Sequence, residues 1–334
     1  MALTLHVDGE RWRAHLRQVV DRNPGLVPVI KGNGYGFGLA RLAGEAQRLG
    51  VPAVAVGTPG EVPLVRQQFS RDIVVLEPWH PALVDGHLSG DPRVLRTVAH
   101  PEAVRAFHRT NHRVLVELRT SMQRHGLESV EDTTGLRSEG WALHLPFAGN
   151  AKAEVMRRVA ALPEQPTDIW VSHLLGGALD EVRRRFPDRR FRPRVGTALW
   201  LGAPDALRAR ATVLDVHRLP RGTRVGYRQH RMVKDGYLVV VSGGTGHGVG
   251  LEAPKPVSGV DTRAKVLAAG ALGAAGLTLS PFTIGGRQRW FAEPPHMQVS
   301  LVLMPDDVDV PAIGEEIPVQ VRNTTVLFDR VVGL

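Results

Sequence analysis

A lysine stands where an apolar run meets a cluster of glycines. In the stretch LVPVIKGNGYGFG, Lys31 ends a strand-like run and is followed by glycines at positions 32, 34, 36 and 38. A lysine in an apolar setting has a lowered pKa, and its neutral amine can form a Schiff base with a carbonyl compound. The glycines leave space beside it for a bulky ligand. The simpler alternative is a lysine whose charged end reaches solvent.

Other candidate residues lie within or just after strand-like runs. They are Tyr35, Glu117, Arg124, His144, Ser172, His173, Arg194, Gly196 and Thr197. Several of them can hold an anion, and the backbone N–H groups of Gly196 and Thr197 can cradle a phosphate. The set indicates one reactive amine beside an anion-binding region.

Eight strand-like runs alternate with helical patterns and must position these residues. The runs span 26–31, 52–58, 72–78, 93–99, 113–120, 140–147, 168–175 and 191–202. This count and alternation predict a (β/α)₈ barrel, with an open doubly wound sheet as the alternative. In a barrel the carboxyl ends of the strands meet at one face, so the polar residues named above are expected to converge there.

The sequence changes character after about residue 212. Strand-like runs separated by Gly and Pro follow, and helical periodicity is largely confined to RAKVLAAGALGAAG, residues 263–276. The pattern predicts two domains, a barrel over residues 1–212 and an all-β domain over residues 213–334.

Composition narrows the class of protein. The chain has 334 residues, a formal net charge of +9 and no cysteine, so it can form no disulfide or thiolate metal site. No apolar run is long enough to span a membrane, and MALTLHVDGERWRAHL lacks the apolar core of a signal peptide. The arginines are scattered over helix faces. We therefore expect a cytoplasmic protein that binds neither nucleic acid nor membranes and holds no metal.

The lysine stretch resembles a known motif. VPVIKGNGYGFG is similar to the pyridoxal-phosphate lysine motif of bacterial alanine racemases, a strand followed by K-A-N-A-Y-G-H-G. VELRTSMQRHG, GWALHLPFAG, WVSHLLGG and RPRVGTALWLG resemble later motifs of that family in the same order. The resemblance spans most of the chain. It implies a fold-type III pyridoxal-phosphate enzyme, built as a (β/α)₈ barrel with a C-terminal β-domain.

The resemblance also implies a role for each polar residue. Lys31 would bind pyridoxal phosphate covalently, and Arg194 would face the pyridine nitrogen and keep it unprotonated. The other residues would surround the cofactor, with His144 against the ring, Arg124 toward the phenolic oxygen, and Tyr35, Gly196, Thr197 and either Ser172 or His173 at the phosphate.

Two departures from the family pattern concern charge and proton transfer. Glu117 stands where the family usually has a carbamylated lysine, and we expect it to pair with Arg124, with a plain surface ion pair as the alternative. The family takes its second base, a tyrosine, from the partner subunit's β-domain. The matching stretch SGGTGHG has Thr245 there, and His247 is the neighbour with a suitable pKa, unless its role is structural.

The resemblance therefore predicts a homodimeric amino-acid racemase that abstracts the Cα proton, with Lys31 and His247 as its bases. Two alternatives stay open. One is a cofactor-binding homologue with little or no activity, acting as a carrier or regulator. The other is a different reaction at Cα, such as decarboxylation.

Overall fold

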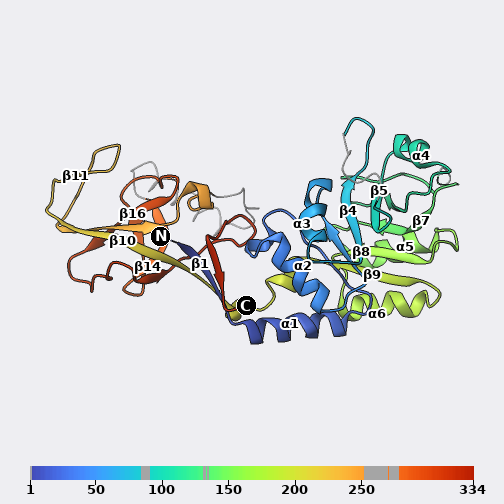
Figure 1. Cartoon of the computed structure of the whole chain (residues 1–334), viewed down its shortest axis with the longest axis horizontal. Helices are drawn as coiled ribbons and strands as arrows, with labels where there is room; N and C mark the ends of the chain where they lie inside the picture. Colours follow the sequence, from blue (N-terminus) through green and yellow to red (C-terminus); the bar gives the residue numbers. More distant parts are fainter. Residues whose placement is uncertain (1, 84–90, 131–132, 134, 252–269, 271–277) are drawn as a thin grey trace. The chain divides into compact units, whose positions relative to one another are not determined.

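The computed structural model describes residues 2–83, 91–130, 133, 135–251, 270 and 278–334. The chain divides into two compact units (Figure 1). One comprises Glu10–Ala203, and the other comprises Met1–Gly9 together with Pro204–Leu334. The division after residue 203 lies ahead of the predicted boundary at residue 212, which falls inside strand β10 (Leu207–Leu219).

Eight parallel strands form the sheet of the first unit. They are β2 (Val27–Pro28), β3 (Ala53–Val56), β4 (Asp72–Pro78), β5 (Val94–Val98), β6 (Val114–Leu118), β7 (Ser138–Leu143), β8 (Asp168–Ser172) and β9 (Arg190–Val195). Their order is β2-β9-β8-β7-β6-β5-β4-β3. The two end strands meet through a bridge between Val29 and Ala55, so the sheet closes on itself. The predicted (β/α)₈ barrel is confirmed, and the open-sheet alternative is wrong.

Helices surround these strands in Figure 1. They are α1 (Gly9–Arg22), η1 (Gly34–Gly36), α2 (Leu39–Arg48), η2 (Pro59–Glu61), α3 (Val62–Arg66), α4 (Pro101–Phe107), α5 (Ala151–Ala160), α6 (Gly176–Arg185) and α7 (Thr197–Trp200). Helix α2 buries Leu42, Ala43 and Ala46 at helical spacing, which is the apolar face expected of a helix that covers a sheet. The segment PALVDGHL after the third strand lies largely outside the described residues.

Alanine, valine and leucine side chains fill most of the barrel interior. They are Val27, Val29, Ala53, Ala55, Val74, Leu95, Leu115 and Ala142, together with the large ring of Trp170. The guanidinium of Arg192 lies over the Trp170 ring, 5.4 Å from its centroid. The interior is therefore a packed core, and ligands must bind at the ends of the strands.

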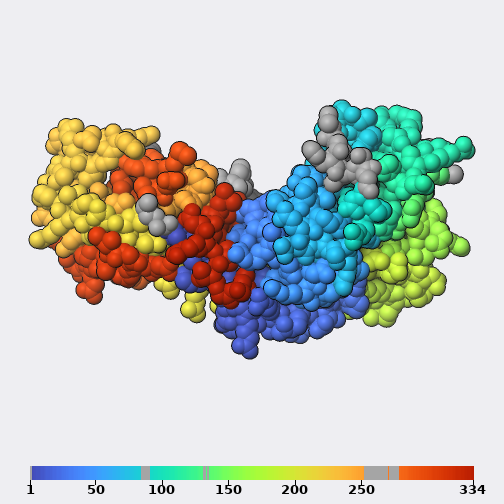
Figure 2. Space-filling view, in the orientation of Figure 1, coloured from blue at the N-terminus to red at the C-terminus, as the bar shows by residue number. Residues whose placement is uncertain are grey.

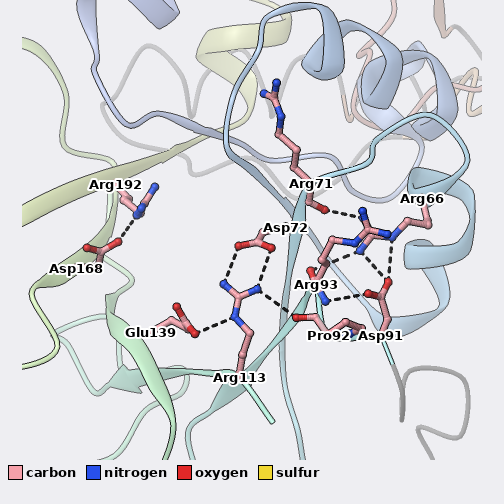
Figure 3. Close-up of polar contacts among 10 residues, drawn as sticks. All are labelled: Arg66, Arg71, Asp72, Asp91, Pro92, Arg93, Arg113, Glu139, Asp168 and Arg192. Atoms are coloured by element: carbon pink, nitrogen blue, oxygen red, sulfur yellow. Dashed lines mark hydrogen bonds and ion pairs between the residues drawn. The ribbon is translucent and has the colours of Figure 1, made fainter. Parts of the chain in front are cut away.

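The amino-terminal ends of the strands carry a network of ion pairs (Figure 3). Arg113 donates two hydrogen bonds to Asp72, at 2.9 and 2.7 Å, and its Nε donates to Glu139 at 2.8 Å. Asp168 pairs with Arg192 beside them. These residues lie at or beside the starts of β4, β6, β7, β8 and β9, so the network ties neighbouring strands together at the end opposite Lys31.

The second unit is built from β-strands, as predicted. Its main sheet has the order β14-β15-β16-β13-β10-β1-β18, with β17 paired to β10. The strands are β1 (Leu3–Val7), β10, β13 (Gly236–Ser242), β14 (Leu279–Ile284), β15 (Arg287–Phe291), β16 (Val299–Pro305), β17 (Glu316–Pro318) and β18 (Arg330–Val332). Short 3₁₀ turns lie at η4 (Pro204–Ala206) and η5 (Thr245–His247). The helical pattern predicted at 263–276 falls almost entirely outside the described residues.

The first strand of the chain belongs to this second unit. Strand β1 pairs antiparallel with β10, with Leu3 opposite Ala211, and parallel with β18. Strand β1 was not predicted, because its partners lie far away in the sequence, with Leu3 opposite Ala211 and Thr4 opposite Arg330. A separate hairpin, β11 (Arg224–Val225) with β12 (His230–Arg231), lies in the yellow segment on the visible surface of Figure 2. Within the described residues no helix has the length and apolar content needed to cross a bilayer.

Candidate active site

Lys31 lies directly after the strand that closes the barrel. Ile30 before it is fully buried, whereas the Lys31 side chain opens to solvent at the carboxyl end of the strands. The Lys31 carbonyl accepts a hydrogen bond from the Gly34 N–H at 3.1 Å, so the chain turns sharply. All four glycines of the stretch have positive φ, which other residues adopt only with strain. A Cβ on Gly34 would lie 2.8 Å from the Leu39 nitrogen, so this glycine serves the turn as well as any ligand.

Tyr35 brings the turn after Lys31 against strand β9. Its φ of 54° is left-handed and its ring is buried. A Cβ on Gly196 would lie only 2.1 Å from the Tyr35 hydroxyl, so the absence of a side chain at Gly196 is what admits the phenol. Burial, followed by the charge of Glu61, raises the pKa of Tyr35 to about 12. The hydroxyl therefore stays protonated and can donate a hydrogen bond beside the backbone that starts α7.

Three cations converge at the carboxyl end of the barrel. Burial lowers the pKa of Lys31, and the nearby charges of Arg124 and Arg194 lower it further, although Glu61 opposes them. The Lys31 amine therefore loses its proton more readily than an exposed lysine does. A neutral amine is the form that attacks a carbonyl group, so this environment suits Schiff-base formation.

Arg194 is a buried cation with an incomplete set of partners. Its Nη2 donates to the Leu143 carbonyl at 3.3 Å, but its buried Nε has no acceptor within the described part of the chain. A buried donor without a partner costs about 1–3 kcal/mol.

Glu117 is also buried, which raises its pKa, while Arg194 and Arg124 act in the opposite direction. Among the described residues no ion pair within 4.0 Å joins Glu117 to Arg124, so any attraction acts over a longer distance.

The rings of two histidines contact each other beside these cations. The rings of His144 and His173 lie 5.7 Å apart at 68°, and Phe147 contacts His173 with ring centroids 4.0 Å apart. Burial, with smaller contributions from nearby cations, lowers the pKa of His144 to about 3. His144 is thus a neutral ring at physiological pH. Ser172 accepts a hydrogen bond from the Leu145 N–H at 2.9 Å and so fixes the segment after His144.

Thr197, beside Gly196, is exposed at the first residue of α7, close to the Tyr35 hydroxyl that packs on Gly196. The structure therefore brings the predicted residues of the first unit to the carboxyl end of one barrel. Sequence analysis assigned no role to Glu61, whose carboxylate accepts hydrogen bonds from the N–H groups of Gly32 and Gly57, at 2.7 and 2.6 Å. A local signal for it is the capping pattern of Thr58 with Glu61.

His247 lies in the second unit, where both of its ring nitrogens have partners. Its Nδ1 accepts from the Gly244 N–H at 3.3 Å, so its Nε2 carries the proton and donates to Asp329 at 3.1 Å. Asp329 also accepts from the Leu3 N–H at 2.7 Å and thereby holds strand β1. This arrangement supports the alternative that His247 has a structural role and is not a base.

A second histidine lies next to Thr245. The Thr245 N–H donates to the His296 carbonyl at 2.8 Å, and His296 Nε2 contacts Glu293 at 2.6 Å. Tyr227 covers the His296 ring with centroids 4.4 Å apart. Burial opposes ionisation of Glu293, but hydrogen bonds from His296 and from two backbone N–H groups outweigh it and lower the pKa. Sequence analysis did not identify this pair. No three acidic or histidine residues in the described ranges are grouped to hold a metal.

A closed parallel barrel followed by an all-β unit is the fold of solved alanine racemases. Residues 7–161 match the family model described as "Alanine racemase, N-terminal domain". The resemblance seen in the sequence motifs is therefore confirmed.

Solved alanine racemases share the fold at low sequence identity. The enzyme from Bartonella henselae, with covalently bound pyridoxal phosphate, is 16% identical with a TM-score of 0.73, covering 99% of this chain and 100% of its own. Those from Enterococcus ("E. faecalis") and Bacillus anthracis are 19% and 17% identical, with TM-scores of 0.66 and 0.68. They cover 95% of this chain and 88% and 85% of their own. No curated protein gives a match.

Proposed function

We propose that this protein is a pyridoxal-phosphate-dependent amino-acid racemase of the alanine racemase type, which exchanges the proton at Cα. The observation that carries the proposal is the convergence of a lysine of lowered pKa with a buried arginine whose Nε has no acceptor among the described residues. A cytoplasmic location and a homodimer, with the C-terminal unit completing the partner subunit's site, belong to the same proposal.

The residues at the barrel end fit pyridoxal phosphate. Lys31 supplies the amine for the aldehyde, and the partnerless Nε of Arg194 supplies a donor for the ring nitrogen. His144 offers a neutral ring surface, and the Tyr35 hydroxyl beside Gly196 offers a donor for the phosphate. The related structure from Bartonella henselae is described with this cofactor covalently bound.

Each residue then has a defined task. When bound, pyridoxal phosphate draws electrons from the amino-acid Cα and makes its proton easier to remove. Lys31 would hold the cofactor through its amine, and its Nζ would carry the Cα proton. Arg194, as a permanent cation that donates to the ring nitrogen, keeps that nitrogen unprotonated. Arg124 attracts the phenolic oxygen, and Glu117 offsets the charge of the two arginines.

Racemisation also needs a proton-transfer group on the opposite face of Cα. The sequence prediction gives this task to His247, which can act only if the hydrogen bond that Gly244 donates to Nδ1 is broken. The second candidate function is therefore a cofactor-binding homologue with weak or no racemase activity. The occupied ring of His247, together with Thr245 in the tyrosine position, favours it.

Spectroscopy with the purified chain tests the proposal. Added pyridoxal phosphate should produce the absorbance band of a protein Schiff base, which Lys31→Ala should abolish and the exposed-lysine control Lys234→Ala should retain. Amino acids in heavy water should then exchange Cα–H and lose optical activity. A band without exchange would favour the carrier function, and no band at all would refute both.

A further inference from the structure

The barrel closes where β2 meets β3, and we call this junction the seam. Few backbone hydrogen bonds join the two strands there. Strand β2 has two residues, and closure rests on the bridge between Val29 and Ala55, with the Ile30 N–H donating to the Ala55 carbonyl at 2.7 Å. In a parallel ladder the next bond would run from the Gly32 N–H to the Gly57 carbonyl. That carbonyl instead accepts from Glu77 at 2.9 Å, on the β4 side.

The carboxylate of Glu61 occupies this place in the ladder. Its Oε1 accepts from the Gly32 N–H at 2.7 Å, and its Oε2 accepts from the Gly57 N–H at 2.6 Å. Oε2 also lies 3.3 Å from the Thr58 nitrogen, which donates to it. Hydrogen bonds to an ionised acceptor are about twice as strong as neutral ones. The Glu61 side chain therefore joins the two sides of the seam, because it accepts hydrogen bonds from the backbone N–H groups of both Gly32 and Gly57.

The bridge lies next to Lys31. A Cβ on Gly57 would be 3.1 Å from both Glu61 Oε2 and Lys31 Cβ, so the carboxylate and the stem of the lysine converge over the same backbone atom. Gly32, whose N–H Glu61 holds, directly follows Lys31. Fixing that peptide fixes the direction in which the Lys31 side chain leaves the strand.

We propose that Glu61 is a positioning residue for Lys31, whose carboxylate closes the barrel between Gly32 and Gly57 and sets both the direction and the charge environment of the lysine. Glu61 touches no reacting atom in this role. The catalytic meaning of the proposal rests on the proposed function, but the effect on Lys31 can be measured without cofactor or substrate.

The groups that act on Lys31 have opposite signs. Arg124 and Arg194 lower its pKa together with burial, and Glu61 is the anion that raises it. His144 and His173 lie near enough for Lys31 to lower their own pKa values. Removing the Glu61 charge leaves the cations unopposed, so the pKa of Lys31 should fall further.

The test titrates Lys31 in the cofactor-free protein. The chain has five lysines, so ¹³C-methylation of the amines gives few NMR signals, and loss of one in Lys31→Arg assigns Lys31. Glu61→Gln should lower the Lys31 titration midpoint by roughly 0.5–1 pH unit. The matched control Glu128→Gln removes an exposed carboxylate paired with Arg119 and should leave the midpoint unchanged.

Glu61→Gln also removes one of the two hydrogen bonds by which this side chain joins Gly32 to Gly57. A glutamine oxygen can accept from one backbone N–H, while its NH₂ group faces the other donor. Glu61→Asp keeps the charge but is one methylene shorter, so it should shift the Lys31 midpoint in the same direction by a smaller amount. If Glu61→Gln does not fold, Glu61→Asp decides alone. An unchanged Lys31 midpoint in a folded variant would overturn the proposal, whether or not the protein forms a Schiff base.

Discussion

At the residue scale, the site depends on side chains held in their neutral form. The pKa of His144 is about 3 and that of Tyr35 about 12, so both stay uncharged over the physiological range. The positive charge near Lys31 comes from the guanidinium groups of Arg124 and Arg194, which lower the pKa of Lys31 together with desolvation.

His144 should make the folded protein less stable in acid. An unfolded histidine binds its proton near pH 6.5 and the folded one near 3, so between these values the unfolded state holds more protons. Stability should thus rise with pH, by at most about 1.4 kcal/mol per pH unit. The ring is half-buried, so screening reduces this slope. Urea unfolding at pH 4, 5, 6 and 7 should show a shallower dependence for His144→Asn, and equal slopes would contradict the assignment.

Gly196→Ala should weaken cofactor binding. Its Cβ would lie 2.1 Å from the Tyr35 hydroxyl, so the phenol must leave its place. The strain should cost about 1–3 kcal/mol, seen as a rise of about fivefold or more in the pyridoxal-phosphate Kd by absorbance titration. Gly177→Ala is the control, because nothing lies within 4 Å of a Cβ there. Similar Kd values for the two variants would remove Tyr35 and Gly196 from the phosphate side.

At the element scale, short turns carry most of the functional geometry. The turn from β2 to η1 aims Lys31 and Tyr35, and the turn from β9 to α7 receives the Tyr35 hydroxyl. In the second unit, η5 is held by His247, which connects it to Asp329 and thus to strand β1. Each turn is fixed by a partner distant in sequence.

His247→Ala should destabilise the second unit. It removes the hydrogen bonds to Gly244 and Asp329, a loss of about 1–3 kcal/mol in the free energy of unfolding. The Schiff-base band at Lys31 should persist. Thermal unfolding checks this prediction against His230→Ala, an exposed histidine in the same unit. A variant of wild-type stability that lost only Cα–H exchange would instead establish His247 as the second base.

At the scale of the whole molecule, the ion-pair network and the candidate active site lie at opposite ends of the barrel. The amino-terminal end holds the network around Arg113 (Figure 3). The carboxyl end holds Lys31 and its neighbours. Such a division lets residues at the carboxyl end vary while the strands stay joined at the other end.

Arg113→Met should therefore lower stability without changing the site. It leaves Asp72 and Glu139 without their shared cation, which should cost about 2–4 kcal/mol in urea unfolding. The Lys31 titration midpoint should not move. Arg105→Met, which breaks an exposed pair with Glu102, should cost less than about 0.5 kcal/mol. Equal losses in the two variants would show that the network adds nothing.

The local sequence determined the barrel, the all-β unit and the place of Lys31. Strand and helix periods are local properties, and a parallel barrel sends every strand's carboxyl end to one face. Residues near the carboxyl ends of those strands, such as Tyr35 and Arg194, could therefore be predicted from the sequence to lie close together.

The tertiary structure alone decided which groups touch. It paired β1 with β10, bridged the barrel seam with Glu61, occupied both nitrogens of His247 and left Arg194 Nε without an acceptor. Each result depends on atoms far apart in the chain, whose approach is set by packing of the whole fold. A residue type shows what a side chain can do, but the distance to its partners decides which of those things it does.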